Sequence, residues 1–196
     1  MMIASNYRKA TNAAYELLCK HYSGVLPVID VKKLVEQMPN IKIHTYSEVA
    51  RKLNMSFEHF AYRFASSEYG YTIKQVSSGN NLIFINDLKD EKTIRFSIAH
   101  ELGHIILNHA KDTDTTDREA NCFARNLLCP IQISDGFNVQ TIQEYVNCFG
   151  ISEPMAETTI SYRKSDEYYI TQENYQKFND KVYCYFSGCT LAELYG

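Results

Sequence analysis

Several features that assign a protein to a common class are missing from this sequence. Its 196 residues include no tryptophan, and none of its six cysteines forms a Cys-x-x-Cys pair. The formal net charge of −3 provides no basic excess of the kind that attracts nucleic acids. No apolar run approaches the ~20 residues that span a bilayer, and the first residues lack a signal-peptide core. We therefore expect no membrane segment and no direct binding of nucleic acid.

The cysteines are scattered along the chain, at Cys19, Cys122, Cys129, Cys148, Cys184 and Cys189. Cys122 and Cys129 fall in an apolar helical segment, where a thiol is usually a small core hydrophobe. This usage predicts a cytoplasmic protein with reduced thiols, and an exported protein with disulfides is the alternative. The length fits one domain, or one domain with a small appendage.

Hydrophobic periodicity predicts an α+β fold that is mostly helical and has a small antiparallel sheet. Alternation predicts strands at 41–46, 69–76 and 82–85, the last two joined by a turn at 77–81. Helical spacing predicts helices at 5–22, 47–65, 91–109, 117–128, 139–148, 153–164 and 172–186. We expect residues 1–130 to form the main domain, with residues 131–196 as a helical region packed on it.

The most informative segment is His100-Glu101-Leu102-Gly103-His104, which lies inside one of the predicted helices. Residues four apart share a helix face, so both imidazoles can point at one metal ion. Zinc hydrolases use this pattern with a third protein ligand and a water molecule. Glu101 is then the natural general base for that water. The alternative is a pair of core histidines beside an unrelated surface glutamate.

The third ligand must come from outside this segment, and the candidates are His109, Asp112, Asp114, Asp117 and Glu119. On a continuous helix, His109 would point away from the face that carries His100 and His104. The three aspartates have short side chains in or next to a loop. Glu119 opens the next predicted helix at the edge of its apolar stripe. Residues 116–119 also match a capping box, so the spacing leaves Glu119 open as a ligand or a cap.

Two segments closely resemble the ImmA/IrrE family of metallopeptidases. They read I-R-F-S-I-A-H-E-L-G-H at 94–104 and R-E-A-N-C-F-A-R-N-L-L-C-P at 118–130. The resemblance is clear from about residue 25 to residue 130. It implies a zincin-like metallopeptidase domain in which His100, His104 and Glu119 hold Zn²⁺ and Glu101 is the catalytic base.

The same resemblance implies an endopeptidase whose protein substrate is a helix-turn-helix repressor of the Xre type. Cleavage would then derepress genes of a mobile element or a stress response. The alternative is a zinc-containing regulator that binds a transcription factor or DNA without cutting its partner. Composition and spacing do not bear on the choice of substrate.

The last third of the sequence contains a pattern similar to a helix-turn-helix. Gly150 supplies the turn and Ser152 can cap the second helix. Glu153 and Glu157 stand where a recognition helix would carry basic or amide side chains, which favours a packing role over DNA binding. The tyrosine-rich tail beyond this pair suits either a partly buried core edge or a protein–protein surface.

Overall fold

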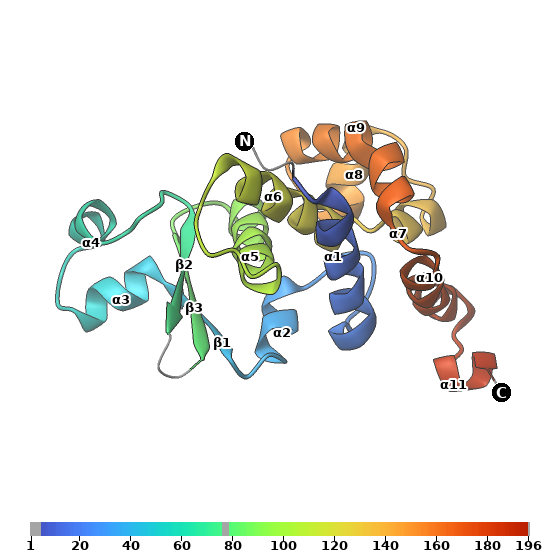
Figure 1. Ribbon diagram of the computed structural model, residues 1–196, viewed down its shortest axis with the longest axis horizontal. Coiled ribbons are helices and arrows are strands. Elements are labelled where there is room, and N and C mark those ends of the chain that lie inside the picture. The colour runs from blue at the N-terminus through green and yellow to red at the C-terminus, as the bar shows by residue number, and fades with distance from the viewer. Residues whose placement is uncertain (1–4, 76–78, 196) are drawn as a thin grey trace.

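The computed structural model describes residues 5–75 and 79–195, and it confirms a mostly helical α+β fold (Figure 1). In chain order the elements are α1 (Tyr7–His21), α2 (Val31–Glu36), β1 (Ile41–Thr45), α3 (Tyr46–Lys52), α4 (Phe57–Arg63), β2 (Gly70–Gln75), β3 (Asn80–Ile85), α5 (Glu91–Ile106), α6 (Asp114–Leu128), α7 (Ile131–Gly136), α8 (Ile142–Phe149), α9 (Glu153–Tyr169), α10 (Gln172–Ser187) and α11 (Leu191–Tyr195).

The sheet is mixed rather than wholly antiparallel. Its strand order is β1-β3-β2, and β2 and β3 form the antiparallel pair that the sequence predicted. β1 pairs with β3, on the side of β3 opposite to β2, and runs parallel to it. The chain passes through α3 and α4 between β1 and β2, so the two strands are not joined as a hairpin. Within the described residues β2 therefore keeps one unpaired edge. Of the expected turn, residues 77 and 78 lie outside the described part of the chain.

Several helix boundaries differ from the sequence prediction for local reasons. The single helix expected at 47–65 is two, because Asn54 adopts a left-handed φ of 53° and Ser56 caps α4. The helix expected to reach residue 109 ends at Ile106. The next helix begins earlier than expected, where Thr113 caps α6. The helix-turn-helix pattern is present as α8 and α9, with Gly150 at a left-handed φ of 62° between them.

Helix α5 lies at the centre of the fold, with the sheet on one side and α1, α6 and the later helices on the other, whereas α3 and α4 lie beyond the sheet (Figure 1). It contacts β2, β3 and α2 as well as α6, and its Ile98 and Leu102 are fully buried. α1 packs on α6, α9 and α10, where Tyr15 meets Phe178 edge-on at 5.8 Å between ring centroids. One cluster of buried apolar side chains thus includes residues before and after position 130. The division of the chain there stays a prediction.

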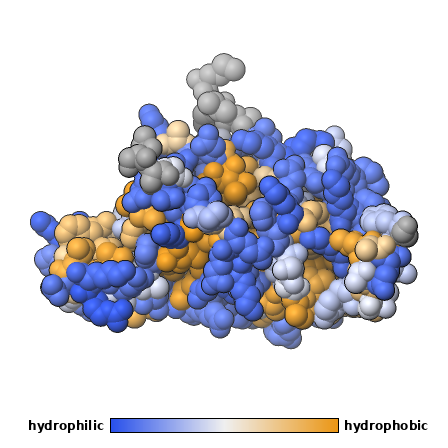
Figure 2. All heavy atoms as spheres, turned by 90° about the horizontal axis from the view of Figure 1, so that it is seen from below, coloured by the Kyte–Doolittle hydropathy of each residue, from blue (hydrophilic) through white to orange (hydrophobic). Residues whose placement is uncertain are grey.

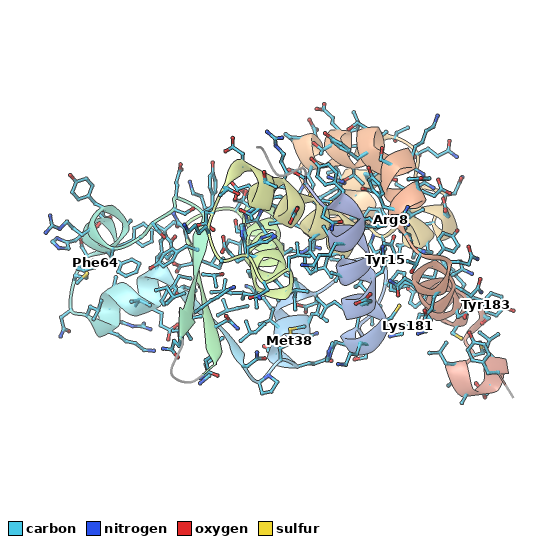
Figure 3. All side chains as sticks on the ribbon, in the orientation of Figure 1. Arg8, Tyr15, Met38, Phe64, Lys181 and Tyr183 are labelled. Carbon is cyan, nitrogen blue, oxygen red and sulfur yellow. The ribbon has the colours of Figure 1, made fainter. Side chains whose placement is uncertain are left out.

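The tyrosine-rich tail is partly buried and partly exposed. Phe178 is in the core, whereas Tyr183, labelled on α10 in Figure 3, is 55% exposed. Lys181 reaches from the same helix to donate to the carbonyls of Leu18 and Tyr22 at the end of α1. Cys122 and Cys129 are buried, which confirms their interpretation as core residues.

The face drawn in Figure 2 is mainly polar, and its apolar side chains appear in separate patches. Phe64, at the α4 end of the molecule in Figure 3, is one of the exposed aromatic residues. Among the helices of the described residues, none is long and apolar enough to cross a membrane.

A buried ion pair joins α6 to α9. Arg125 donates from Nε and Nη2 to the two carboxylate oxygens of Asp166 at 2.7 and 2.8 Å, and both side chains are less than 10% exposed. The substitution Arg125→Met leaves the Asp166 charge buried without a partner. We expect it to lower the free energy of unfolding by about 3–5 kcal/mol, measured by denaturant titration.

The double variant Arg125→Met/Asp166→Leu removes both charges and should recover most of that loss. The exposed pair of Lys177 and Glu173 on α10 provides the control, because Lys177→Met should leave the unfolding transition unchanged. Equal effects of Arg125→Met and Lys177→Met would contradict the role of the buried pair.

Candidate metal centre

The two histidines of the motif face the same point in space. Asp90 begins α5 by accepting a hydrogen bond from the Thr93 amide, and the apolar side of the helix anchors it in the core. His100 and His104 are then one turn apart, and their Nε2 atoms lie 3.0 Å from each other. The predicted placement of both imidazoles on one helix face is confirmed.

Asp117 on α6 is the carboxylate that joins this pair. Its Oδ1 lies 3.5 Å from Nε2 of His104 and 4.0 Å from Nε2 of His100. Among the described residues, these three are the group whose ligand atoms are close enough to hold one metal ion. Two imidazole nitrogens and one carboxylate oxygen, with Asp117 half-exposed at the opening, fit a zinc site that keeps one position open.

The close approach of α6 to α5 depends on Gly103, inside the motif. A Cβ atom at this position would lie 3.1 Å from Cδ1 of Phe123 and 3.2 Å from Cα of Ala120. The absent side chain lets the two helices pack almost backbone to backbone. The start of α6, with Asp117, is thereby held beside the histidines.

Asn121 supports the first histidine. It follows Asp117 by four residues on α6 and therefore lies on the same helix face. Its Oδ1 is 2.9 Å from Nδ1 of His100. With the amide oxygen accepting, the His100 proton is on Nδ1 and the Nε2 lone pair is directed at the shared point.

Glu119, the third ligand predicted from the family resemblance, lies elsewhere in this structure. Its Oε2 is 2.9 Å from Nε2 of His109, and its Oε1 accepts from the Asn6 amide at 2.6 Å. Glu119 follows Asp117 by two residues, which is roughly 200° around a helix, so the two carboxylates face different neighbours. The geometry favours Asp117, and a ligand role for Glu119 stays a sequence-based prediction.

The capping role that the sequence left open for Glu119 is also not observed. The capping box of α6 is formed by Thr113 and Thr116, because the helix begins three residues earlier than expected. Glu119 is well inside the helix and makes its contacts across to α1 and to His109.

His109 is the residue that sequence reasoning misplaced. α5 ends at Ile106, and Asn108 turns the chain with a left-handed φ of 58°. The His109 amide then donates back to the carbonyl of His104 at 3.0 Å, and the Asn108 amide donates to that of Ile105. This pair of bonds is a Schellman motif, which brings the residue after the turn against the last turn of the helix. The asparagine at position 108, shortly after the apolar stripe of the helix, is the sequence feature that could have predicted this turn.

Glu101, predicted from the sequence as the general base, borders the same cleft as the two histidines. It lies between the histidines on α5, and its Oε2 accepts a hydrogen bond of 2.8 Å from the Thr72 hydroxyl on β2. Burial raises the pKa of Glu101 to about 7, although the Thr72 hydrogen bond acts in the opposite direction. A carboxylate with a pKa near neutrality both takes up and releases a proton readily.

Burial favours the neutral form of both motif histidines. Burial, together with the neighbouring His100 and His109, lowers the pKa of His104 to about 4. Burial also lowers the pKa of His100. Neutral imidazoles are the form that binds metal ions, so the site is prepared for a cation without first losing protons.

A cleft runs past these residues. A polar pocket of about 460 Å³ is lined by His104 and Asp117. A mostly apolar pocket of about 520 Å³ adjoins it at His100 and Glu101. Gly70 of β2 borders both pockets. Phe96, Pro154 and Met155 contribute to the apolar pocket, so α9 forms part of the wall of the cleft.

Comparison with known proteins agrees with this arrangement. The profile of the IrrE N-terminal-like domain, peptidase family M78, matches residues 63–161, just over half of the chain. The matched segment contains the hairpin strands, α5, α6 and most of α9, and therefore every residue of the candidate centre. A search of curated proteins gives no match.

Proposed function

The chain belongs to the M78 family of metallopeptidases, and from this premise we propose that it is a zinc-dependent endopeptidase that cleaves a helix-turn-helix repressor. The observation that carries the chemistry is the convergence of Nε2 of His100, Nε2 of His104 and Oδ1 of Asp117 beside the Glu101 carboxylate. The choice of an Xre-type repressor rests on the resemblance to the ImmA/IrrE family.

In this proposal His100, His104 and Asp117 hold the metal, and Glu101 moves the protons. When bound, zinc supplies a Lewis acid that polarises the scissile carbonyl and lowers the pKa of water to about 7. Glu101, held by Thr72, takes a proton from the attacking water on its free oxygen and passes it to the leaving amine. Burial raises the pKa of Glu101 to about 7, which suits its carboxylate to both proton transfers.

The cleft suggests how a peptide lies across the centre. The unpaired edge of β2 borders it, and an extended peptide can add to such an edge through backbone hydrogen bonds. A scissile bond beside Glu101 would then place one neighbouring side chain in the apolar pocket. We propose that this pocket, walled by Phe96 and Met155, accepts an apolar side chain.

The contacts of α9 support a protein partner rather than DNA. The first turn of this helix lines the cleft through Pro154 and Met155. In a DNA recognition helix, these first residues would have to face the major groove of DNA instead. Arg163 is held in an ion pair with Asp135 and a hydrogen bond to Ser134. These contacts favour an endopeptidase over a DNA-binding regulator.

The proposal is tested by incubating the zinc-loaded protein with a helix-turn-helix repressor of the Xre type, sought among the genes that neighbour its own. We expect two repressor fragments, with an apolar residue next to the cut by mass spectrometry, and no fragments when a chelator is present. A stable complex that contains only intact repressor would contradict proteolysis and support the non-proteolytic alternative.

A further inference from the structure

A hydrogen-bond network begins at Nδ1 of His104, the ring nitrogen that faces away from the proposed metal site. Nδ1 of His104 lies 3.1 Å from Nδ1 of His109, and Nε2 of His109 lies 2.9 Å from Oε2 of Glu119. The other oxygen of Glu119 accepts from the backbone amide of Asn6 at 2.6 Å. The hydrogen bonds therefore connect a proposed metal ligand on α5 to Asn6, the N-cap residue of α1.

The two ends of this hydrogen-bond network, the metal-binding Nε2 of His104 and the Glu119 carboxylate, determine which ring nitrogen of each histidine carries the proton. If Nε2 of His104 binds a cation, its proton is on Nδ1, and that N–H donates to His109. Nδ1 of His109 must then accept, so the proton of His109 is on Nε2 and is donated to Glu119. Each donor meets an acceptor, and the Glu119 carboxylate ends the network with two hydrogen bonds.

The two outer side chains of this hydrogen-bond network are largely buried. The side chains of His109 and Glu119 are only 7% and 12% exposed. The Schellman turn at Asn108 fixes the backbone of His109 against His104. Asp112 is the other carboxylate near Nδ1 of His104, but at 3.7 Å and 91% side-chain exposure it lies beyond hydrogen-bond reach.

We infer that His109 and Glu119 are positioning residues, which hold His104 in the tautomer and orientation that present Nε2 to the metal. This inference depends on the proposed function only in treating His104 as a metal ligand. It gives Glu119 a role in metal binding that needs no direct contact between Glu119 and the ion. Outer partners of metal-binding histidines typically contribute 10–100-fold to metal affinity.

The test measures zinc affinity of the folded protein by competition with a chromophoric chelator. We expect His109→Phe, which keeps the ring but removes the acceptor, to weaken zinc binding about 10–100-fold. Glu119→Ala should weaken it within the same range. Because both act through one contact with His104, the double variant should bind zinc no more weakly than the weaker single variant.

The controls separate this inference from the proposed function. His59→Phe, on the exposed surface of α4, should leave zinc affinity unchanged. If His104→Ala retains zinc affinity, the proposed centre itself is wrong. If His104→Ala loses zinc while His109→Phe does not, only the positioning role is wrong. A Glu119→Ala loss far larger than that of His109→Phe, and additive with it, would make Glu119 a direct ligand instead.

A measurement on the unaltered protein covers the case in which a variant does not fold. Two-bond ¹⁵N–¹H spectra of the zinc-loaded protein report which ring nitrogen of each histidine carries the proton. We expect the proton on Nδ1 of His104 and on Nε2 of His109. A proton on Nδ1 of His109 would overturn the inference, because that nitrogen could then no longer accept from His104.

Discussion

Replacing Glu101 by glutamine is expected to abolish peptide cleavage and to leave zinc binding intact. The amide has nearly the same shape and can still accept the Thr72 hydrogen bond through its oxygen. It cannot take a proton from water, and loss of general-base catalysis costs about 10²–10⁴-fold in rate. The measurement is single-turnover cleavage of the repressor, followed by gel electrophoresis, with zinc content determined on the same sample.

Glu91→Gln is the matched control, because Glu91 is an exposed glutamate at the start of the same helix. It should cleave at the unaltered rate. A Glu101→Gln protein that binds zinc fully and still cuts the repressor would show that another group accepts the proton. A Glu101→Gln protein that has lost its zinc would place the carboxylate in the metal-binding set instead.

Replacing Asp117 by alanine is expected to remove zinc from the purified protein. The change deletes the carboxylate nearest to the converging nitrogens of His100 and His104 and leaves only two protein ligands. The fall in affinity should exceed the ~10–100-fold that is typical of outer partners, and cleavage should be lost with the metal. Metal analysis after gel filtration, together with chelator competition, measures both the amount bound and the affinity.

Asp112→Ala is the control for Asp117→Ala, since Asp112 is an exposed aspartate in the preceding loop and lines the same polar pocket. It should retain zinc. The ranking of variants then decides the third ligand: Asp117→Ala should bind zinc more weakly than Glu119→Ala. The reverse ranking would return the role of third ligand to Glu119.

Local patterns in the sequence were sufficient to predict how His100, Glu101 and His104 are placed relative to one another. His100, Glu101 and His104 lie within a single helical turn, so their relative placement follows from helix geometry and requires no tertiary information. The hairpin of β2 and β3 followed in the same way from alternation and from the turn residues between the strands. The parallel pairing of β1 did not, because it depends on where α3 and α4 carry the chain.

The third carboxylate could not be placed from the sequence because it depends on which side of α6 packs against α5. A helix that begins at Asp114 instead of residue 117 still directs Asp117 and Glu119 to different sides, and only the packing against α5 and α1 shows which side meets the histidines. His109 was misplaced for a related reason. Its position is set by the left-handed residue Asn108, which ends the helical arrangement that the prediction assumed.

The central claim is that the Nε2 atoms of His100 and His104 and a carboxylate oxygen of Asp117 bind one zinc ion beside Glu101. Anomalous diffraction at the zinc edge from crystals of the zinc-loaded protein tests it most directly. The account predicts one peak about 2.0–2.2 Å from these three atoms, with Glu101 outside the ligand set. A peak bound by Glu119 in place of Asp117, or no peak between the two histidines, would contradict it.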